Sequence, residues 1–164
     1  MDKLLRTASL LFSGLFAGFL LGVLVLESSL REYDAAVYTQ VRQVELDSLD
    51  TLASVTLIPA IITTVVLAIR ARGNNRRLVL MAAALLLVVF ATTLAINLPI
   101  NADQGDWSVQ NPPADWASLR DRWQVAHLVR TVAAILAFAS LITATLSRPT
   151  PVPRPTPEAI NAGR

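Results

Sequence analysis

Four long apolar runs dominate the pattern of hydrophobic and polar positions along the chain. They cover residues 7–26, 52–69, 78–98 and 125–146. Only the last run contains ionisable side chains, His127 and Arg130. Each run is close to the roughly 20 residues that an α-helix needs to cross about 30 Å of hydrocarbon. Because backbone polar groups in lipid must satisfy one another, we expect four spanning helices that form an all-α membrane bundle.

The segments between the runs predict the rest of a single membrane domain, residues 1–146. Apolar residues recur at near-helical spacing in residues 27–51, which predicts an extra outer amphipathic helix that continues from the first span or lies on the membrane surface. Its apolar positions are Leu30, Tyr33, Val37, Val41, Val44 and Leu49. Residues 97–115 are expected to form a long outer loop, because Pro112 and Pro113 prevent a helix from continuing. Residues 147–164 are rich in proline and predict a disordered tail.

Composition narrows the class of protein. Hydrophobic residues make up 54% of the 164-residue chain and charged residues 16%, whereas soluble domains carry about 25% charged residues. The chain has no cysteine and one histidine, which excludes disulfides, thiolate metal sites and sites with several histidines. We therefore expect no metal site. The basic residues are too few and too scattered to indicate a nucleic-acid partner. The spans themselves contain no carboxylate, which argues against a proton relay or a cation pathway.

The distribution of charge predicts the orientation in the membrane. With four spans, both termini lie on one side, and that side carries nine Lys and Arg residues against two acidic ones. The other side carries four Arg residues against ten acidic ones. Because cytoplasmic loops are enriched in basic residues, we expect an integral plasma- or inner-membrane protein with both termini in the cytoplasm.

The fourth helix carries a line of polar and aromatic residues on one face. At 100° per residue, its members fall within about 40° of one line along the helix. They are Trp116, Arg120, Trp123, His127, Arg130 and Ala134, and Phe138 and Leu141 extend the line. An interfacial anchor would account for the first three. It accounts less well for His127 and Arg130, because an arginine at the centre of a membrane helix costs roughly 2.5–3.5 kcal/mol on insertion scales.

Two further features leave alternatives open. Asn97 either contributes hydrogen bonds to a site or caps the third helix before Pro99. Gly14, Gly18 and Gly22 form a close-packing stripe at four-residue spacing. The stripe fits packing within the chain, a homo-oligomer, or space for a flat ligand.

Residues 97–131, "NLPINADQGDWSVQNPPADWASLRDRWQVAHLVRT", resemble the signature of the anthrone oxygenase family of small membrane proteins. The matching positions are Asn97, Pro99, Asn101, Trp107, Trp116, Arg120, Trp123, His127 and Arg130. The four-span layout also fits that family, so the resemblance extends over about residues 5–146.

The resemblance implies an oxygenase without a cofactor, with molecular oxygen as co-substrate and a flat anthrone- or quinol-like molecule as substrate. In this hypothesis His127 is the base, Arg130 stabilises the developing oxyanion, and Asn97 orients one of the reactants. The remaining residues of the substrate site would be Trp123 and Trp107, which stack on the rings, Arg120 at the entrance, and Asn101 and Trp116.

Two other classes of function stay open alongside the oxygenase. The first is a non-catalytic membrane protein that binds a lipid or a quinone. The second is a structural or assembly protein in which the polar cluster is architectural. A cavity at His127 favours the oxygenase or the binding protein, and solid packing around His127 favours the structural protein.

Overall fold

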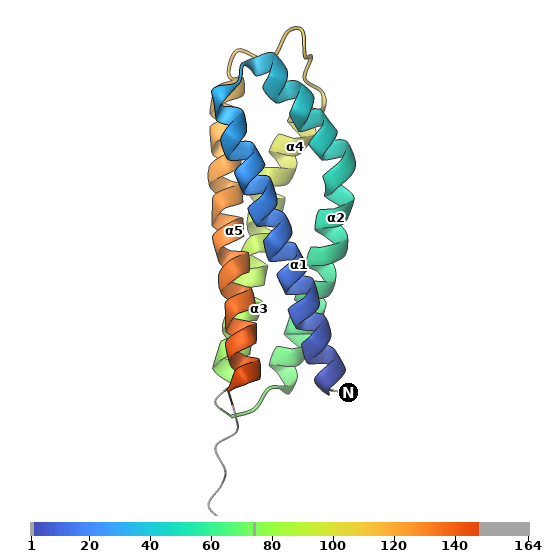
Figure 1. Ribbon diagram of the computed structural model, residues 1–164, viewed down its shortest axis with the longest axis vertical. Helices are drawn as coiled ribbons and strands as arrows, with labels where there is room; N and C mark the ends of the chain where they lie inside the picture. The colour runs from blue at the N-terminus through green and yellow to red at the C-terminus, as the bar shows by residue number, and fades with distance from the viewer. Residues whose placement is uncertain (1, 74, 148–164) are drawn as a thin grey trace, which may run out of the picture.

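The structure, a computed structural model, describes residues 2–73 and 75–147, which form one bundle of long helices (Figure 1). In chain order the elements are α1 (Asp2–Ser29), the 3₁₀ turn η1 (Leu30–Glu32), α2 (Ala35–Arg70), α3 (Asn75–Thr92), the π-helical segment η2 (Thr93–Asn97), α4 (Leu98–Gly105) and α5 (Trp116–Leu146). Four helical stretches are long and apolar enough to cross a membrane, with α3, η2 and α4 forming one of them. The predicted four-span helical bundle is therefore confirmed. The expected Pro-rich tail lies outside the described residues from position 148 onward.

The two ends of the bundle differ. The N-terminus, the end of α5 and the α2–α3 connection lie at one end, which we call the basal end (Figure 1). The turn η1 and the connection into α5 lie at the other, distal end. Helix α1 packs against α2 and α5, and α3 packs against α5 and α2. Large aliphatic side chains are exposed on every long helix, as expected where lipid surrounds the bundle.

The distal part of α2 differs from the predicted separate helix. Residues 35–51 are the first turns of one continuous helix that runs to Arg70. The helix begins at Asp34, whose side chain accepts a hydrogen bond from the backbone N–H of Val37 at 2.9 Å. The predicted apolar stripe faces outward at Val37 and Val44, which are exposed, while Arg42 and Glu45 are buried. The inward face of this segment is therefore its polar face.

The chain also stays helical beyond Asn97, where a loop was predicted. Pro99 lies in the first turn of α4, where its missing N–H does not break a helix. The N–H of Leu98 donates to the carbonyl of Thr93, and this wider π-type turn lets the helix pass the proline. Asn97 is therefore not a C-terminal cap, and the predicted loop shortens to the residues between α4 and α5.

The glycine stripe on α1 makes one close contact within the chain. A Cβ atom at Gly14 would lie 3.0 Å from the ring of Phe138 on α5. A Cβ atom at Gly18 or Gly22 would meet no atom within 4 Å. Gly14 thus serves packing within the bundle, whereas the other two glycines border open space.

Candidate active site

A cavity of about 170 Å³ lies in the distal half of the bundle. Its walls come from α1, α2, α5 and the α3–α4 stretch. Apolar side chains such as Phe19, Leu57 and Phe90 line much of it, and His127, Arg130, Asn97, Asn101 and Trp123 line its polar part. Five of the predicted site residues, from two separate helical stretches, therefore meet around one space. A pocket that is mostly apolar with a few convergent polar groups is typical of small-molecule sites.

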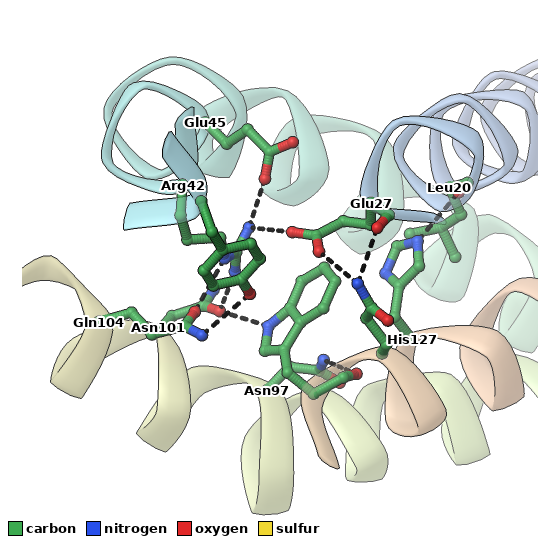
Figure 2. Close-up of polar contacts among 11 residues, drawn as sticks. Leu20, Glu27, Arg42, Glu45, Asn97, Asn101, Gln104 and His127 are labelled. Atoms are coloured by element: carbon green, nitrogen blue, oxygen red, sulfur yellow. Dashed lines mark hydrogen bonds and ion pairs between the residues drawn. The ribbon is translucent and has the colours of Figure 1, made fainter. Parts of the chain in front are cut away.

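His127 is held in a defined orientation within α5. Its Nε2 atom lies 3.0 Å from the backbone carbonyl of Leu20 on α1 (Figure 2). Because a carbonyl only accepts hydrogen bonds, Nε2 is the donor, and in a neutral imidazole the lone pair is then on Nδ1. The Nδ1 atom is buried and has no hydrogen-bond partner among the described residues. The fold thus leaves one basic nitrogen free in a residue that lines the cavity.

Two other cavity residues also have unpaired polar atoms. Arg130 is 6% exposed, and its Nε atom makes no hydrogen bond within residues 2–73 and 75–147. None of the ion pairs among these residues includes Arg130. Asn97 is also buried, with Nδ2 3.4 Å from the carbonyl of Trp123 and Oδ1 unpaired. Because burying a polar atom without a partner is costly, Arg130 and Asn97 are candidates for contact with a polar ligand.

Beside this site, Arg42 on α2 is the centre of a buried polar network (Figure 2). It pairs with Glu45 at 2.7 Å and with Glu27 of α1 at 3.5 Å. It also donates to Gln104 at 2.8 Å and to the Oδ1 atom of Asn101 at 2.6 Å. Three helical elements, α1, α2 and α4, are thereby tied together by one guanidinium group that uses all of its nitrogens. Such multidentate binding by arginine gives the network a fixed geometry.

Trp123 connects the Arg42 network with His127. The guanidinium carbon of Arg42 lies 4.0 Å from the centroid of the Trp123 ring. The imidazole of His127 stacks on the same residue with centroids 4.8 Å apart and planes 7° apart. The indole of Trp123 is therefore in contact with both the guanidinium of Arg42 and the imidazole of His127. Trp123 lines the cavity, but its ring already packs against these two side chains.

Three predicted substrate residues do not line the cavity. Trp107 lies in a separate apolar cluster with Leu30 and Tyr38 at the distal end. Trp116 packs against the ring of Tyr38 and lies under the guanidinium of Arg120. These residues close the distal end of the bundle. The line on α5 faces the interior, as its periodicity predicted, but its first two turns lie beyond the cavity.

The π-helical segment positions two of the site residues. It inserts one wider turn between α3 and α4, after which Asn97 and Asn101, four residues apart, both line the cavity. Asn101 accepts hydrogen bonds at Oδ1 from the indole of Trp123 at 2.6 Å and from Arg42. Such π-turns within helices occur frequently at functional sites.

Sequence reasoning missed the carboxylates of this region. Glu45 and Asp50 line the cavity, and Glu27 is fully buried beside it, although the spans defined by hydropathy exclude all three. The sequence does contain a signal for these polar residues. Tyr38, Arg42 and Glu45 are four and then three residues apart, which places them on one face of a helix. The spans contain no carboxylate, as predicted, but the cavity also draws on residues just outside the spans. No group of three or more metal-ligating side chains is found in the part of the chain that the structure describes.

Comparison with known families adds one finding. Residues 50–140, more than half of the chain, match the family model described as anthrone oxygenase. The matched region includes every cavity residue on α3, η2, α4 and α5 and excludes Arg42, Glu45 and all of α1. No curated protein and no solved structure matches the chain.

Proposed function

Because the chain belongs to the anthrone oxygenase family, we propose that it is a membrane-embedded oxygenase that oxidises a flat aromatic ketone or quinol without a cofactor. The observation that carries the proposal is that Nδ1 of His127 and Nε of Arg130, neither of which has a hydrogen-bond partner among the described residues, belong to side chains at one largely apolar cavity. These groups suit a reaction that begins by removing a proton from carbon and continues through an oxyanion.

The proposed reaction needs only a base, a cationic partner and oxygen. In an anthrone, the CH₂ carbon between two aryl rings and opposite a carbonyl is acidic. Nδ1 of His127 takes one proton from this carbon, and the electron pair delocalises onto the carbonyl oxygen as an enolate. One electron passes to O₂, and the resulting radical pair joins to form a carbon–oxygen bond and a peroxide anion. The peroxide takes up the proton from His127 and loses water as the second C–H bond breaks, which leaves the new carbonyl.

This sequence is balanced without an external reductant. One oxygen atom enters the quinone and the other leaves as water, while the two hydrogens of the carbon end in that water molecule. Because His127 returns the proton that it removed, no net proton must leave the site. A buried base without an obvious proton path is compatible with such a cycle.

Arg130 supports the enolate in this scheme. Its positive charge is not neutralised by any carboxylate within ion-pairing distance among the described residues, so it is available to an oxygen that becomes negative during the reaction. The unpaired Oδ1 atom of Asn97 accepts a hydrogen bond from a hydroxyl group of the substrate or of the peroxide. In comparable sites, removal of one donor that stabilises an oxyanion lowers kcat by a factor of about 10²–10³.

The aromatic residues take roles that differ from the predicted ones. Trp123 holds the imidazole of His127 in place, because it stacks on that ring and is fixed by Asn101. In this proposal the substrate rings instead contact Phe19 of α1 and Phe90 of α3, which line the cavity. The cavity volume of about 170 Å³ is below the roughly 300–1,000 Å³ of typical ligand pockets. We therefore expect a compact planar substrate that also occupies the cavity mouth.

The test is oxygen consumption by the purified protein with a panel of anthrones and quinols. With ¹⁸O₂ and an anthrone, we expect one labelled atom in the quinone and one in water, whereas a quinol that is only dehydrogenated gives an unlabelled quinone. His127→Ala should lower kcat by about 10²–10⁴, the usual contribution of a general base. Leu128→Ala, the exposed neighbour on the same helix, is the matched control and should stay close to wild type.

The outcomes separate the competing functions. An unchanged rate in His127→Ala would remove the base assignment. Glu45→Gln and Asp50→Asn would then test whether one of the two carboxylates at the cavity is the base. Tight binding of the panel with no oxygen uptake by the wild type would favour a non-catalytic lipid- or quinone-binding protein. Neither binding nor uptake would favour a structural role.

A further inference from the structure

The cavity reaches the outer surface of the bundle on one side. Four of its large hydrophobic lining residues are substantially exposed: Ile58 (50%), Phe90 (38%), Leu94 (50%) and Leu98 (43%). Ile58 belongs to α2, and the other three belong to the continuous α3–α4 stretch. The exposed rim therefore follows the line along which α2 faces that stretch, and Ser54, also exposed, extends the rim on α2.

The other directions are closed. At the distal end, Arg42 binds Gln104 and Asn101 at 2.8 and 2.6 Å, and Gln43 donates to the carbonyl of Trp107 at 2.7 Å. These bonds hold the start of α2 to α4 and to the connection after it. Towards the basal end, buried apolar residues such as Leu86 and Ala60 fill the bundle. Helices α1 and α5 form the remaining walls, so the opening is lateral.

The depth of this opening follows from helix geometry. At 1.5 Å per residue, Ile58 lies about 18 Å along α2 from Arg70, and Asp50 lies about 30 Å from it. We take Arg70, the basic residue that ends α2, as the basal boundary of the hydrocarbon layer. Because this layer is about 30 Å thick, the opening extends from its distal boundary to near its middle. Its rim is therefore in contact with the acyl chains of the distal leaflet, and the aqueous phase touches only its upper edge near Asp50.

We propose that the rim formed by Ser54, Ile58, Phe90, Leu94 and Leu98 is a lateral portal through which a neutral, flat aromatic molecule dissolved in the distal leaflet enters the cavity. This inference deepens the proposed function by naming the phase that supplies the substrate. An apolar rim matches neutral rings, because such a molecule stays in an apolar environment until it meets Arg130 and His127. A permanently charged analogue would have to lose its hydration to enter the same opening, at a cost of several kcal/mol.

The test measures binding and not turnover. Wild-type protein in liposomes is mixed with 9,10-anthraquinone, and the association rate is followed by quenching of tryptophan fluorescence, since Trp123 lines the cavity. Ser54→Phe adds bulk to the rim and should slow association at least about tenfold, equivalent to about 1.4 kcal/mol of added barrier. Val55→Phe changes the adjacent residue, which is exposed but does not line the cavity, and should leave the rate within about twofold, or 0.4 kcal/mol.

A second pair tests the facing side of the portal. Leu94→Phe on the rim should slow association as Ser54→Phe does, whereas Ala95→Phe, exposed and outside the cavity lining, should not. Equal melting temperatures within each pair show that both variants are folded. All four substituted positions are exposed on the surface of the bundle, so a larger side chain there should not disturb the core. A slower association in the rim variants alone is therefore an effect on the portal and not on folding.

The results distinguish this inference from the proposed function. Equal association rates in the rim variants and their neighbours would overturn the portal, even if the protein consumes oxygen. Slowed association in the rim variants alone would support the portal, even if no anthrone is oxidised. Association of water-soluble anthraquinone-2-sulfonate as fast as that of anthraquinone would also overturn entry from the lipid.

Discussion

At the scale of single residues, two buried arginines have opposite environments. Arg42 binds two carboxylates and two side-chain amides and covers the ring of Trp123. Arg130, also buried, has an unpaired Nε and takes part in no ion pair among the described residues. The first arginine is satisfied by the fold, and the second is not. This contrast predicts that Arg42 stabilises the bundle, whereas Arg130, the residue to which we assign a ligand contact, contributes less to stability.

Matched substitutions of these two arginines should therefore act in opposite directions on stability. Arg42→Met leaves Glu27 and Glu45 buried without a cation, which typically costs about 3–5 kcal/mol, and the melting temperature should fall. Arg130→Met removes a buried charge that is in no ion pair among the described residues, so the melting temperature should stay the same or rise. Oxygen uptake should be lost in Arg130→Met. The measurement is thermal unfolding in one detergent at one protein concentration.

A triple variant provides the control for Arg42. When Glu27→Gln and Glu45→Gln accompany Arg42→Met, the buried charges disappear together and much of the lost stability should return. A fall in melting temperature for Arg130→Met as large as that for Arg42→Met would contradict the assignment of Arg130 to a ligand.

At the scale of elements, close helix packing and the π-helical segment determine where the cavity forms. In the basal half, small and aliphatic side chains from α1, α2, α3 and α5 make one continuous core. In the distal half, η2 places Asn97 and Asn101 at the cavity, and α2 presents its polar face inward. The cavity lies where the packing changes from apolar to polar. The α1–α5 contact at Gly14 belongs to the tightly packed half.

The glycines of α1 should therefore differ in their tolerance of substitution. Gly14→Leu places a side chain where even a Cβ atom would lie 3.0 Å from the ring of Phe138, so the melting temperature should fall, by an amount corresponding to about 1–3 kcal/mol for overpacking. Gly18→Leu and Gly22→Leu extend into open space and should leave the monomer at least as stable, because leucine favours helices more than glycine does.

The same variants test self-association. If Gly18 and Gly22 form a homo-oligomer contact, leucine at either position should shift the mass measured by light scattering towards the monomer. A similar fall in melting temperature at all three glycines, with unchanged mass, would contradict the distinction between Gly14 and the other two.

At the scale of the whole molecule, the bundle is polarised along its long axis. The α2–α3 connection, which is rich in basic residues, lies at the basal end (Figure 1). The polar network and the cavity are formed by residues towards the distal end. The imbalance of Lys and Arg between the two ends predicts that the basal end is cytoplasmic. The portal would then open into the leaflet that is remote from the cytoplasm.

A cysteine-free chain allows a direct test of this orientation. Ser108→Cys and Ser147→Cys each place one thiol at an exposed position, the first near the distal end and the second directly after α5 at the basal end. In intact cells, a membrane-impermeant maleimide should label only Ser108→Cys, and Ser147→Cys should react only after permeabilisation. Wild type is the blank because it has no thiol. The reverse pattern would contradict the predicted orientation and would move the portal to the cytoplasmic leaflet.

Much of the fold was predictable from local pattern alone. Lipid requires long apolar helices, so hydropathy was sufficient to locate the four spans. The line on α5 was predictable because residues three and four apart on one helix share a face whatever surrounds it. The segments that were predicted less well, residues 35–51 and 98–105, are polar extensions of spanning helices. In these segments hydropathy gives no boundary, and the end of each helix depends on contacts with other elements.

The sequence by itself therefore determined the membrane bundle, its family and the inward position of His127 and Arg130. Only the tertiary structure decided which polar groups bind each other: Arg42 pairs with Glu27 and Glu45, Trp123 contacts both Arg42 and His127, and Arg130 is in no ion pair among the described residues. The physical reason is that side-chain pairing between helices depends on how each helix is rotated and tilted against its neighbours. Periodicity within one helix records which residues share a face, but not which partner from another helix meets them.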